Sequence, residues 1–139
     1  MGAVRPGTVL DGRYEVEHEL GRGAMGTVYA AGQLSMSRPV AIKVLASRFV
    51  GDRRERARFR WEAEAAARIA HPHVLRVIDH GIDAKIHRPF TVMERLSGST
   101  LQAILRSCGA LSVEMTAAIL RQICDGSRQP IGRMSCIAT

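Results

Sequence analysis

The sequence predicts an α+β domain in which a five-stranded antiparallel sheet carries one long helix and is followed by two further helices. Three observations carry this prediction. Residues 14–20 alternate apolar and polar side chains with a period of two, as in a half-buried strand. Glycines at positions 21, 23 and 26 separate this run from a second β-favouring run at 27–30. Residues 53–70 are strong helix formers whose apolar side chains recur at helical spacing.

Strands of the sheet are expected both before and after this helix in the sequence. A turn region at 33–38 separates the second strand from the third, so the first three strands predict an antiparallel meander. Pro72 stops the helix near residue 70. Gly81 and residues 83–85 are expected to connect the last two strands. The five strands are predicted at 14–20, 27–30, 39–45, 74–78 and 89–93.

Two helices are expected after the sheet. The Ser-Gly-Ser break at 97–99 precedes a short helix at 101–105, and Ser112 is a suitable N-cap for a longer one that reaches Asp125. The longer helix carries an apolar stripe. Its members are Val113, Thr116, Ala117, Leu120 and Ile123. From residue 127 onward the sequence is polar, without periodicity, and is interrupted by proline and glycine.

Composition narrows the function classes. The 139 residues suit one domain, and the chain has 20 basic against 13 acidic residues, a net charge of +7. The arginine-rich run 53–60 is typical of a solvated helix face, or of a surface for an acidic partner. Nucleic-acid binding stays an alternative because of the charge, but aromatic residues make up only 4%, which leaves little surface for base stacking.

The sequence also predicts a cytoplasmic location. No apolar run approaches the roughly 18 residues of a membrane span, and the first residues lack the apolar stretch of a secretory signal. The three cysteines are odd in number and have no C-x-x-C spacing, so neither a disulfide framework nor a zinc site is indicated. We therefore expect no metal ligands and no membrane segment in this chain.

The glycine loop Gly21-x-Gly23-x-x-Gly26 is weak as a motif by itself. A dinucleotide-binding loop would open a helix, but Thr27 and Val28 favour a strand. A P-loop would end in Gly-Lys-Ser/Thr, and this loop has no such lysine. A hairpin flap whose backbone covers nucleotide phosphates requires strands on both sides, as predicted here. An ordinary glycine-rich hairpin remains open at this point.

Lys43 favours the flap over the ordinary hairpin. Ala41 and Lys43 are two apart on a strand and so project from the same face, the alanine leaving room for a flat ring. Only two of the 20 basic residues, Lys43 and Lys85, are lysines. In this arginine-rich chain, a position that tolerated any cation would be expected to carry arginine. A lysine instead indicates a site that needs a compact ammonium, such as one that contacts phosphate oxygens. An incidental lysine at a sheet edge is the alternative.

Glu62 is the third candidate. It lies three residues after Phe59 and four before Ala66, on the apolar stripe of the long helix. A carboxylate that faces a core needs a cation or hydrogen-bond donors, since burial alone is costly. We predict that Lys43 is this partner.

Together these residues resemble a known family. The matching segments are Leu20-Gly21-Arg22-Gly23-Ala24-Met25-Gly26-Thr27-Val28, Val40-Ala41-Ile42-Lys43, Glu62, His71-Pro72-His73-Val74 and Val92-Met93-Glu94. In order and spacing they resemble protein kinases, in particular bacterial serine/threonine kinases of the eukaryotic-like type. The resemblance covers residues 13 to 124. It implies a kinase N-lobe, ATP as cofactor with Mg²⁺, and protein Ser/Thr as substrate.

The resemblance also implies roles for individual residues. Gly21, Gly23 and Gly26 would cover the phosphates of ATP, and Lys43 would hold the α- and β-phosphates while pairing with Glu62. Leu20, Val28 and Ala41 would form the roof of the adenine pocket, and Met93 would be the gatekeeper. The Glu94 carbonyl and the Leu96 amide would be the hinge groups that hydrogen-bond adenine. The implied boundaries are an N-terminal extension at 1–12, the ATP-binding N-lobe at 13–96, the hinge exit and first C-lobe helices at 97–126, and an atypical tail at 127–139.

The chain departs from the family in its catalytic parts. It contains no asparagine and no Asp-Phe-Gly triplet, and neither His87-Arg88-Pro89 nor Asp79-His80-Gly81 replaces a His-Arg-Asp loop. The catalytic Asp and the metal ligands are therefore absent, and we expect a truncated chain with weak or absent ATP binding and no phosphoryl transfer alone. The apolar stripe of the last helix would then be exposed and favour self-association. A non-catalytic interaction module is the competing interpretation.

Overall fold

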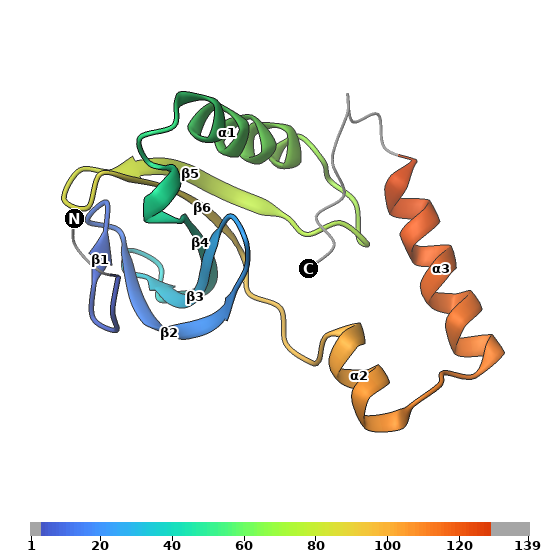
Figure 1. Cartoon of the computed structure of the whole chain (residues 1–139). Coiled ribbons are helices and arrows are strands. Elements are labelled where there is room, and N and C mark those ends of the chain that lie inside the picture. The colour runs from blue at the N-terminus through green and yellow to red at the C-terminus, as the bar shows by residue number, and fades with distance from the viewer. Residues whose placement is uncertain (1–3, 129–139) are drawn as a thin grey trace.

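The computed structural model describes residues 4–128 and contains one curled antiparallel sheet (Figure 1). The strand order is β1-β2-β3-β4-β6-β5. The strands are β1 (Val9–Leu10), β2 (Tyr14–Arg22), β3 (Gly26–Gln33), β4 (Arg38–Leu45), β5 (Val77–Asp83) and β6 (Arg88–Glu94). The helical segments are η1 (Ser47–Phe49), α1 (Arg53–Ala67), α2 (Leu101–Cys108) and α3 (Val113–Ser127). The α+β class is as predicted, and the predicted strands and helices occur in the predicted order, with β1 and η1 in addition.

One face of the sheet forms the hydrophobic core. Its side chains alternate along β3, β4 and β6, so the apolar members of each strand meet those of the next across the ladder. Tyr14 and Phe90 pack edge to face in this core with ring centroids 6.2 Å apart. The core consists of Leu10, Tyr14, Val16, Tyr29, Ala31, Val40, Ile42, Val44, Ile86, Phe90 and Val92.

The sheet has six strands instead of the five predicted. The additional strand, β1, is only two residues long and pairs with the start of β2. Its Leu10 is fully buried. A strand of two residues is too short to show a periodicity, so the sequence pattern did not predict it.

Strand β5 corrects the predicted fourth strand. It begins at Val77, not at residue 74, and runs through Gly81 to Asp83, which were expected to be a turn. Gly81 lies opposite Phe90, where an added Cβ would be 2.9 Å from the phenylalanine ring. This glycine therefore makes room for a ring on the next strand rather than for a bend.

The alternation of β2 is also interrupted. Val16 is buried in the core as predicted, but Leu20 is 49% exposed and does not share its face. Register shifts lie between Val16 and His18 and between Glu19 and Gly21. Each such bulge inserts a residue and changes the face on which the following side chains lie.

Helix α1 packs against β5 and β6 beside the sheet. The Asp52 carboxylate caps its first turn by accepting the N–H groups of Arg54 and Glu55. The helix ends at Ala67, three residues before the predicted end, with Arg68 as its C-cap. Its buried face is the predicted stripe, with Phe59, Glu62, Ala63 and Ala66.

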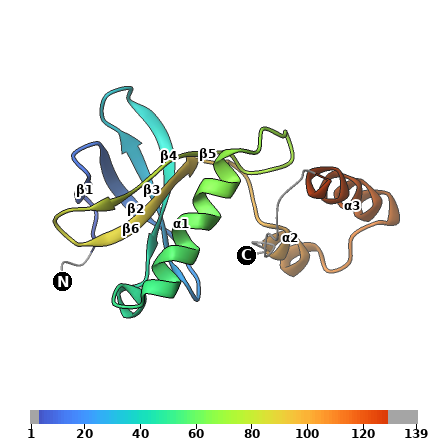
Figure 2. The same ribbon diagram turned by 90° about the horizontal axis from the view of Figure 1, so that it is seen from above.

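Helices α2 and α3 lie beyond the sheet, after an extended segment that follows β6 (Figures 1 and 2). Thr100 and the predicted cap Ser112 each accept a backbone N–H at the helix start. The end of α3 approaches the segment after α1, since a Cβ on Gly126 would lie 3.2 Å from the His73 carbonyl oxygen. Within residues 4–128, no helix combines the length and apolar character that a bilayer crossing requires. Most of the predicted tail lies outside the described residues.

Candidate functional site

The glycine loop joins β2 to β3, so a strand leaves it, not a helix. The Gly23 N–H donates to the Gly26 carbonyl at 2.9 Å and closes the turn. Two hydrogen bonds connect the tip of the loop to the segment after β4. The Ala46 N–H donates to the Met25 carbonyl at 2.8 Å, and the Arg48 guanidinium donates to the Ala24 carbonyl. The loop therefore has a strand on each side, as a hairpin flap requires.

The three loop glycines differ in what surrounds them. A Cβ on Gly26 would lie 2.2 Å from the Val44 carbonyl oxygen, so the sheet itself demands glycine at this position. A Cβ on Gly21 would meet nothing within 4 Å, and one on Gly23 would meet only the Gly26 oxygen at 4.0 Å. The backbone at Gly21 and Gly23 therefore borders open space, where a ligand has access.

Two rows of cross-strand neighbours carry four of the predicted nucleotide contacts. Residues directly opposite each other in a ladder lie on the same face. One row contains Val28, Lys43 and Thr91, and the next contains Ala30, Ala41 and Met93. Both rows lie on the face opposite to the core, because they alternate with its members Ile42 and Val92. The tertiary structure thus brings Val28, Ala41, Lys43 and Met93 together.

Lys43 and Glu62 do not form the predicted ion pair. Glu62 is 9% exposed, and its Oε1 accepts a hydrogen bond from Arg58 Nε at 3.0 Å. The Lys43 Nζ lies instead 5.9 Å from the centroid of the Phe59 ring, a cation–π distance. Phe59 lies one turn before Glu62 on α1, so the ammonium and the carboxylate are on the same side of the molecule. The prediction of a buried carboxylate was confirmed, but its cation is different.

The sequence contained a signal for this different partner. Arg58 precedes Glu62 by four residues, and opposite charges at this spacing are neighbours on a helix surface. An arginine on the same helix needs no tertiary packing to reach the carboxylate, whereas Lys43 comes from a strand. Thr91 was also missed, although it is buried beside Lys43, because its position depends on the register between β4 and β6.

The predicted hinge begins at the last residue of β6, Glu94. The Glu94 N–H donates to the Arg76 carbonyl at 3.1 Å, and the Glu94 carboxylate accepts the Arg76 N–H at 2.8 Å. Arg95 forms an ion pair of 2.8 Å with Glu17 on β2, which ties the first long strand to the hinge. Leu96, after the end of β6, is 71% exposed.

The described residues offer no evident metal centre. Within residues 4–128, no group of three or more His, Cys, Asp and Glu side chains is arranged to hold an ion. We therefore assign no residue to Mg²⁺ and derive no step through it.

Comparisons with known proteins match this geometry. The protein kinase domain family matches residues 14–128. The chain is 38% identical over 118 residues to serine/threonine-protein kinase PknL of Mycobacterium tuberculosis, covering 85% of this chain and 29% of PknL. It is 41% identical over 120 residues to a probable serine/threonine-protein kinase of Streptomyces coelicolor, covering 82% of this chain and 18% of that protein.

A solved structure shows the same fold. The kinase domain of Mycobacterium tuberculosis PknI superposes with a TM-score of 0.77 at 30% identity, over 90% of this chain and 49% of that one. The chain thus spans about half of that kinase domain and less than a third of PknL. The family match, which covers most of the chain, and the strand–loop–strand arrangement lead to the same conclusion. This chain belongs to the protein kinase family and is related to its bacterial serine/threonine kinases.

Proposed function

We propose that residues 13–96 are the ATP-binding N-lobe of a serine/threonine protein kinase, that residues 97–126 are the hinge exit and first C-lobe helices, and that residues 127–139 are an atypical tail. The intact protein would transfer the γ-phosphoryl group of ATP to serine or threonine of a protein substrate. The observation that carries this proposal is the row of Val28, Lys43 and Thr91 below a glycine hairpin.

Each predicted residue has a place in this proposal. Leu20, Val28 and Ala41 cover adenine, with Met93 as the gatekeeper behind it. The Glu94 carbonyl and the Leu96 N–H hydrogen-bond the adenine edge. Gly21, Gly23 and Gly26 cover the phosphates, and Lys43 neutralises charge on the α- and β-phosphates.

The described side chains fit a nucleotide chemically. Ala41 and Ala30 are small and adjacent, which leaves space for a flat base, and Lys43 lies one row further along the same face. The Lys43 ammonium has an aromatic ring as its neighbour and is available for an anionic ligand. Glu62 then acts as a positioning residue, which requires that it exchange Arg58 for Lys43 when the phosphates bind.

We further propose that this chain alone does not transfer phosphate. Phosphoryl transfer depends on positioning and electrostatic stabilisation by several groups together. The sequence lacks asparagine and the Asp-Phe-Gly triplet, so it cannot supply the family's catalytic-loop Asn or that metal ligand. The glycine loop and Lys43 position phosphates but do not accept the proton of a substrate hydroxyl.

The location that goes with this proposal is the cytoplasm, where ATP is available and thiols stay reduced. Cys108 and Cys124 are both free and exposed.

The test compares ATP binding and transfer in matched proteins. A fluorescent ATP analogue is titrated into the chain and into Lys43→Met, with Lys85→Met as the control because Lys85 is the only other lysine. Binding should fall at least about tenfold in Lys43→Met only. Transfer of the γ-phosphate should be undetectable for this chain and should appear when a kinase C-lobe is added. Equal binding by both lysine variants would contradict the proposed site.

A second candidate role, as an interaction module, is favoured by the exposed apolar side chains of α3. Val113, Met115, Leu120 and Ile123 are each more than half exposed. We propose that this surface makes the isolated chain associate with itself.

A further inference from the structure

The Lys43 ammonium has an aromatic partner and no ionic one. Its Nζ lies 5.9 Å from the centroid of the Phe59 ring, and within residues 4–128 Lys43 takes part in none of the ion pairs. Phe59 is 3% exposed and Lys43 is half-buried. The face of an aromatic ring attracts a cation, and it does so more strongly where water is excluded. The ring therefore restricts where the ammonium lies.

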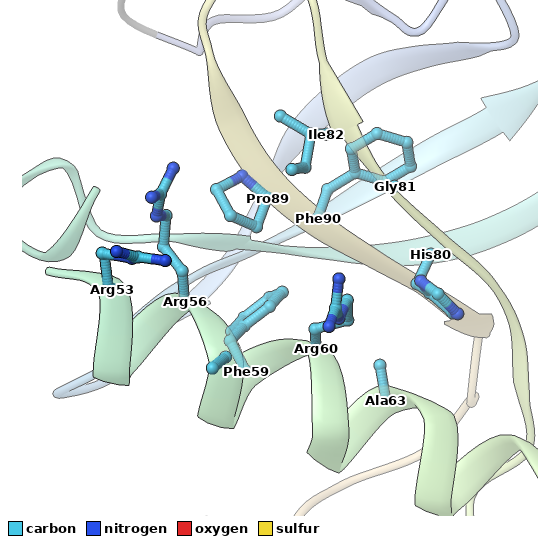
Figure 3. Close-up of a pocket in the computed structure, with 11 residues that line it drawn as sticks. Arg53, Arg56, Phe59, Arg60, Ala63, His80, Gly81, Ile82, Pro89 and Phe90 are labelled. Atoms are coloured by element: carbon cyan, nitrogen blue, oxygen red, sulfur yellow. The ribbon is translucent and has the colours of Figure 1, made fainter. Parts of the chain in front are cut away.

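The Phe59 ring borders a cavity of about 370 Å³ between α1 and the β5–β6 hairpin, and it points from the helix toward the hairpin (Figure 3). Three arginines of α1 and three apolar residues of the hairpin line the same cavity. They are Arg53, Arg56, Arg60, Ile82, Pro89 and Phe90. In the part of the chain that the structure describes, none of these guanidinium groups lies over the Phe59 ring. The cation over the ring comes from β4 instead, so the contact connects the sheet to the helix.

The contact lies close to Glu62 on α1. Phe59 and Glu62 are three residues apart and both are buried, so they are neighbours on the face of α1 that packs against the sheet. Arg58 holds the Glu62 carboxylate at 3.0 Å. While the arginine occupies the carboxylate, the ring keeps the Lys43 ammonium beside the same stretch of α1. The cation that would replace Arg58 is thus already at the helix.

We propose that Phe59 is a positioning residue of the nucleotide site, whose ring holds the Lys43 ammonium against α1 before the phosphates bind. This inference rests on the proposed ATP-binding function. A lysine side chain has four flexible carbons, so holding it in place in advance lowers the entropy that binding has to remove. The ring contacts the ammonium from one side, and the ammonium has three N–H donors. Donors therefore remain for phosphate oxygens and for Glu62.

The experiment uses the fact that the chain has only two lysines, Lys43 and Lys85. Reductive methylation with isotope-labelled formaldehyde keeps the charge of both side chains and gives each a methyl signal in an NMR spectrum. Lys43→Arg and Lys85→Arg assign the two signals. Protons above the face of an aromatic ring are shielded, whereas Lys85 is exposed. The Lys43 signal should therefore lie upfield of the Lys85 signal in the nucleotide-free chain.

Substitutions of Phe59 test the role of the ring. Phe59→Leu keeps an apolar side chain but removes the ring. It should abolish the upfield shift and weaken ATP binding about threefold to tenfold, as followed by titration of the Lys43 methyl signal. Phe59→Tyr keeps the aromatic face, so it should keep the upfield shift and leave the affinity within about twofold of the unsubstituted chain.

Phe90→Leu is the matched control, because Phe90 lines the same cavity but belongs to the core face of the sheet, opposite to Lys43. It should leave the Lys43 signal in place and the ATP affinity within about twofold. Thermal unfolding of each variant checks that the fold is kept.

Two results would overturn this inference alone. Coinciding Lys43 and Lys85 signals in the unsubstituted chain would mean that the ammonium does not lie over the ring. Equal losses of affinity in Phe59→Leu and Phe90→Leu would mean that looser packing of α1, not the position of Lys43, weakens binding. A ring-dependent Lys43 signal that ATP does not move would instead overturn the ATP site on which the inference rests. The comparison of the two lysines needs no Phe59 variant, so it decides the question even if a variant fails to fold.

Discussion

At the scale of single residues, Gly26 is the loop position that leaves no space for a side chain. Gly26→Ala would place a Cβ 2.2 Å from the Val44 carbonyl oxygen, and backbone on both strands would have to move. We expect a loss of about 2 kcal/mol in the free energy of unfolding, as for other overpacked positions. Urea unfolding measures it.

Gly21→Ala is the matched control, because nothing lies within 4 Å of the added methyl group. It should change stability by less than about 0.5 kcal/mol. Equal losses for the two variants would show that the close approach of β3 to β4 is not what requires glycine at position 26.

Arg58 and Lys43 are the two cations that compete for Glu62. Arg58→Ala removes the partner that now holds the carboxylate at 3.0 Å, and Glu62 is then free to pair with Lys43. We expect nucleotide affinity to rise about threefold to tenfold, because less rearrangement precedes binding. Titration of a fluorescent ATP analogue measures the change.

Arg60→Ala is the control for this prediction. It removes the other pair of the same spacing on α1, with Glu64, and should leave nucleotide affinity unchanged. If Arg58→Ala weakens binding, Arg58 supports the site and does not compete within it.

At the scale of elements, Asp83 fastens the turn after β1 to the β5–β6 hairpin. Its Oδ2 accepts the Asp11 N–H at 2.7 Å, and its Oδ1 accepts the N–H groups of Lys85 and Ile86 at 2.9 and 2.8 Å. Burial raises the pKa of Asp83, but the three N–H donors outweigh it and hold the pKa below its ordinary value of 3.8.

The direction of this shift predicts the pH dependence. A carboxyl with a lowered pKa in the folded state stabilises the fold above its unfolded pKa, and the contribution is lost as the pH falls through the folded value. Stability should therefore fall below about pH 4. Asp83→Asn turns an amide donor toward one of the N–H groups and should cost roughly 2 kcal/mol at pH 7. Unfolding curves from pH 7 to 2 measure both effects, and an unchanged acid limb in Asp83→Asn would contradict this account.

At the scale of the whole molecule, the apolar surface of α3 decides how the chain behaves in solution. Leu120 and Ile123 are each 53% exposed. Leu120→Lys with Ile123→Lys should shift the chain toward the monomer in sedimentation velocity over a range of concentrations. Ser97→Lys with Gln102→Lys adds the same charge at exposed polar positions outside α3 and should not. A parent chain that is monomeric at every concentration would contradict self-association.

Much of the fold could be predicted because it depends on local patterns. The alternation at the start of β2, the apolar stripe of α1 and the cap at Ser112 are each properties of a few neighbouring residues. The misplaced start of β5 has a different origin. Gly81 was interpreted as a turn residue, but its role depends on Phe90, nine residues away in sequence and opposite to it in the ladder.

The candidate site was predictable to the same extent. Residues on one strand, such as Ala41 and Lys43, share a face by geometry alone. The partner of Glu62 could not be settled in this way, because Arg58 and Lys43 compete for the same carboxylate and the result depends on how α1 packs against the sheet. The space between α1 and the β5–β6 hairpin had no sequence signature beyond the arginines, since it arises from the tertiary packing of the helix against the hairpin.

The sequence by itself determined the class of fold, the order of its elements and the family, because glycine spacing, strand alternation and one lysine in context are local and specific. The tertiary structure decided which side chains meet. It placed Val28, Lys43 and Thr91 in one row across the sheet and paired Glu62 with Arg58. It also placed three arginines of α1 opposite the apolar β5–β6 hairpin. Register and packing govern such contacts, and both depend on the free energy of the whole chain rather than on any short segment.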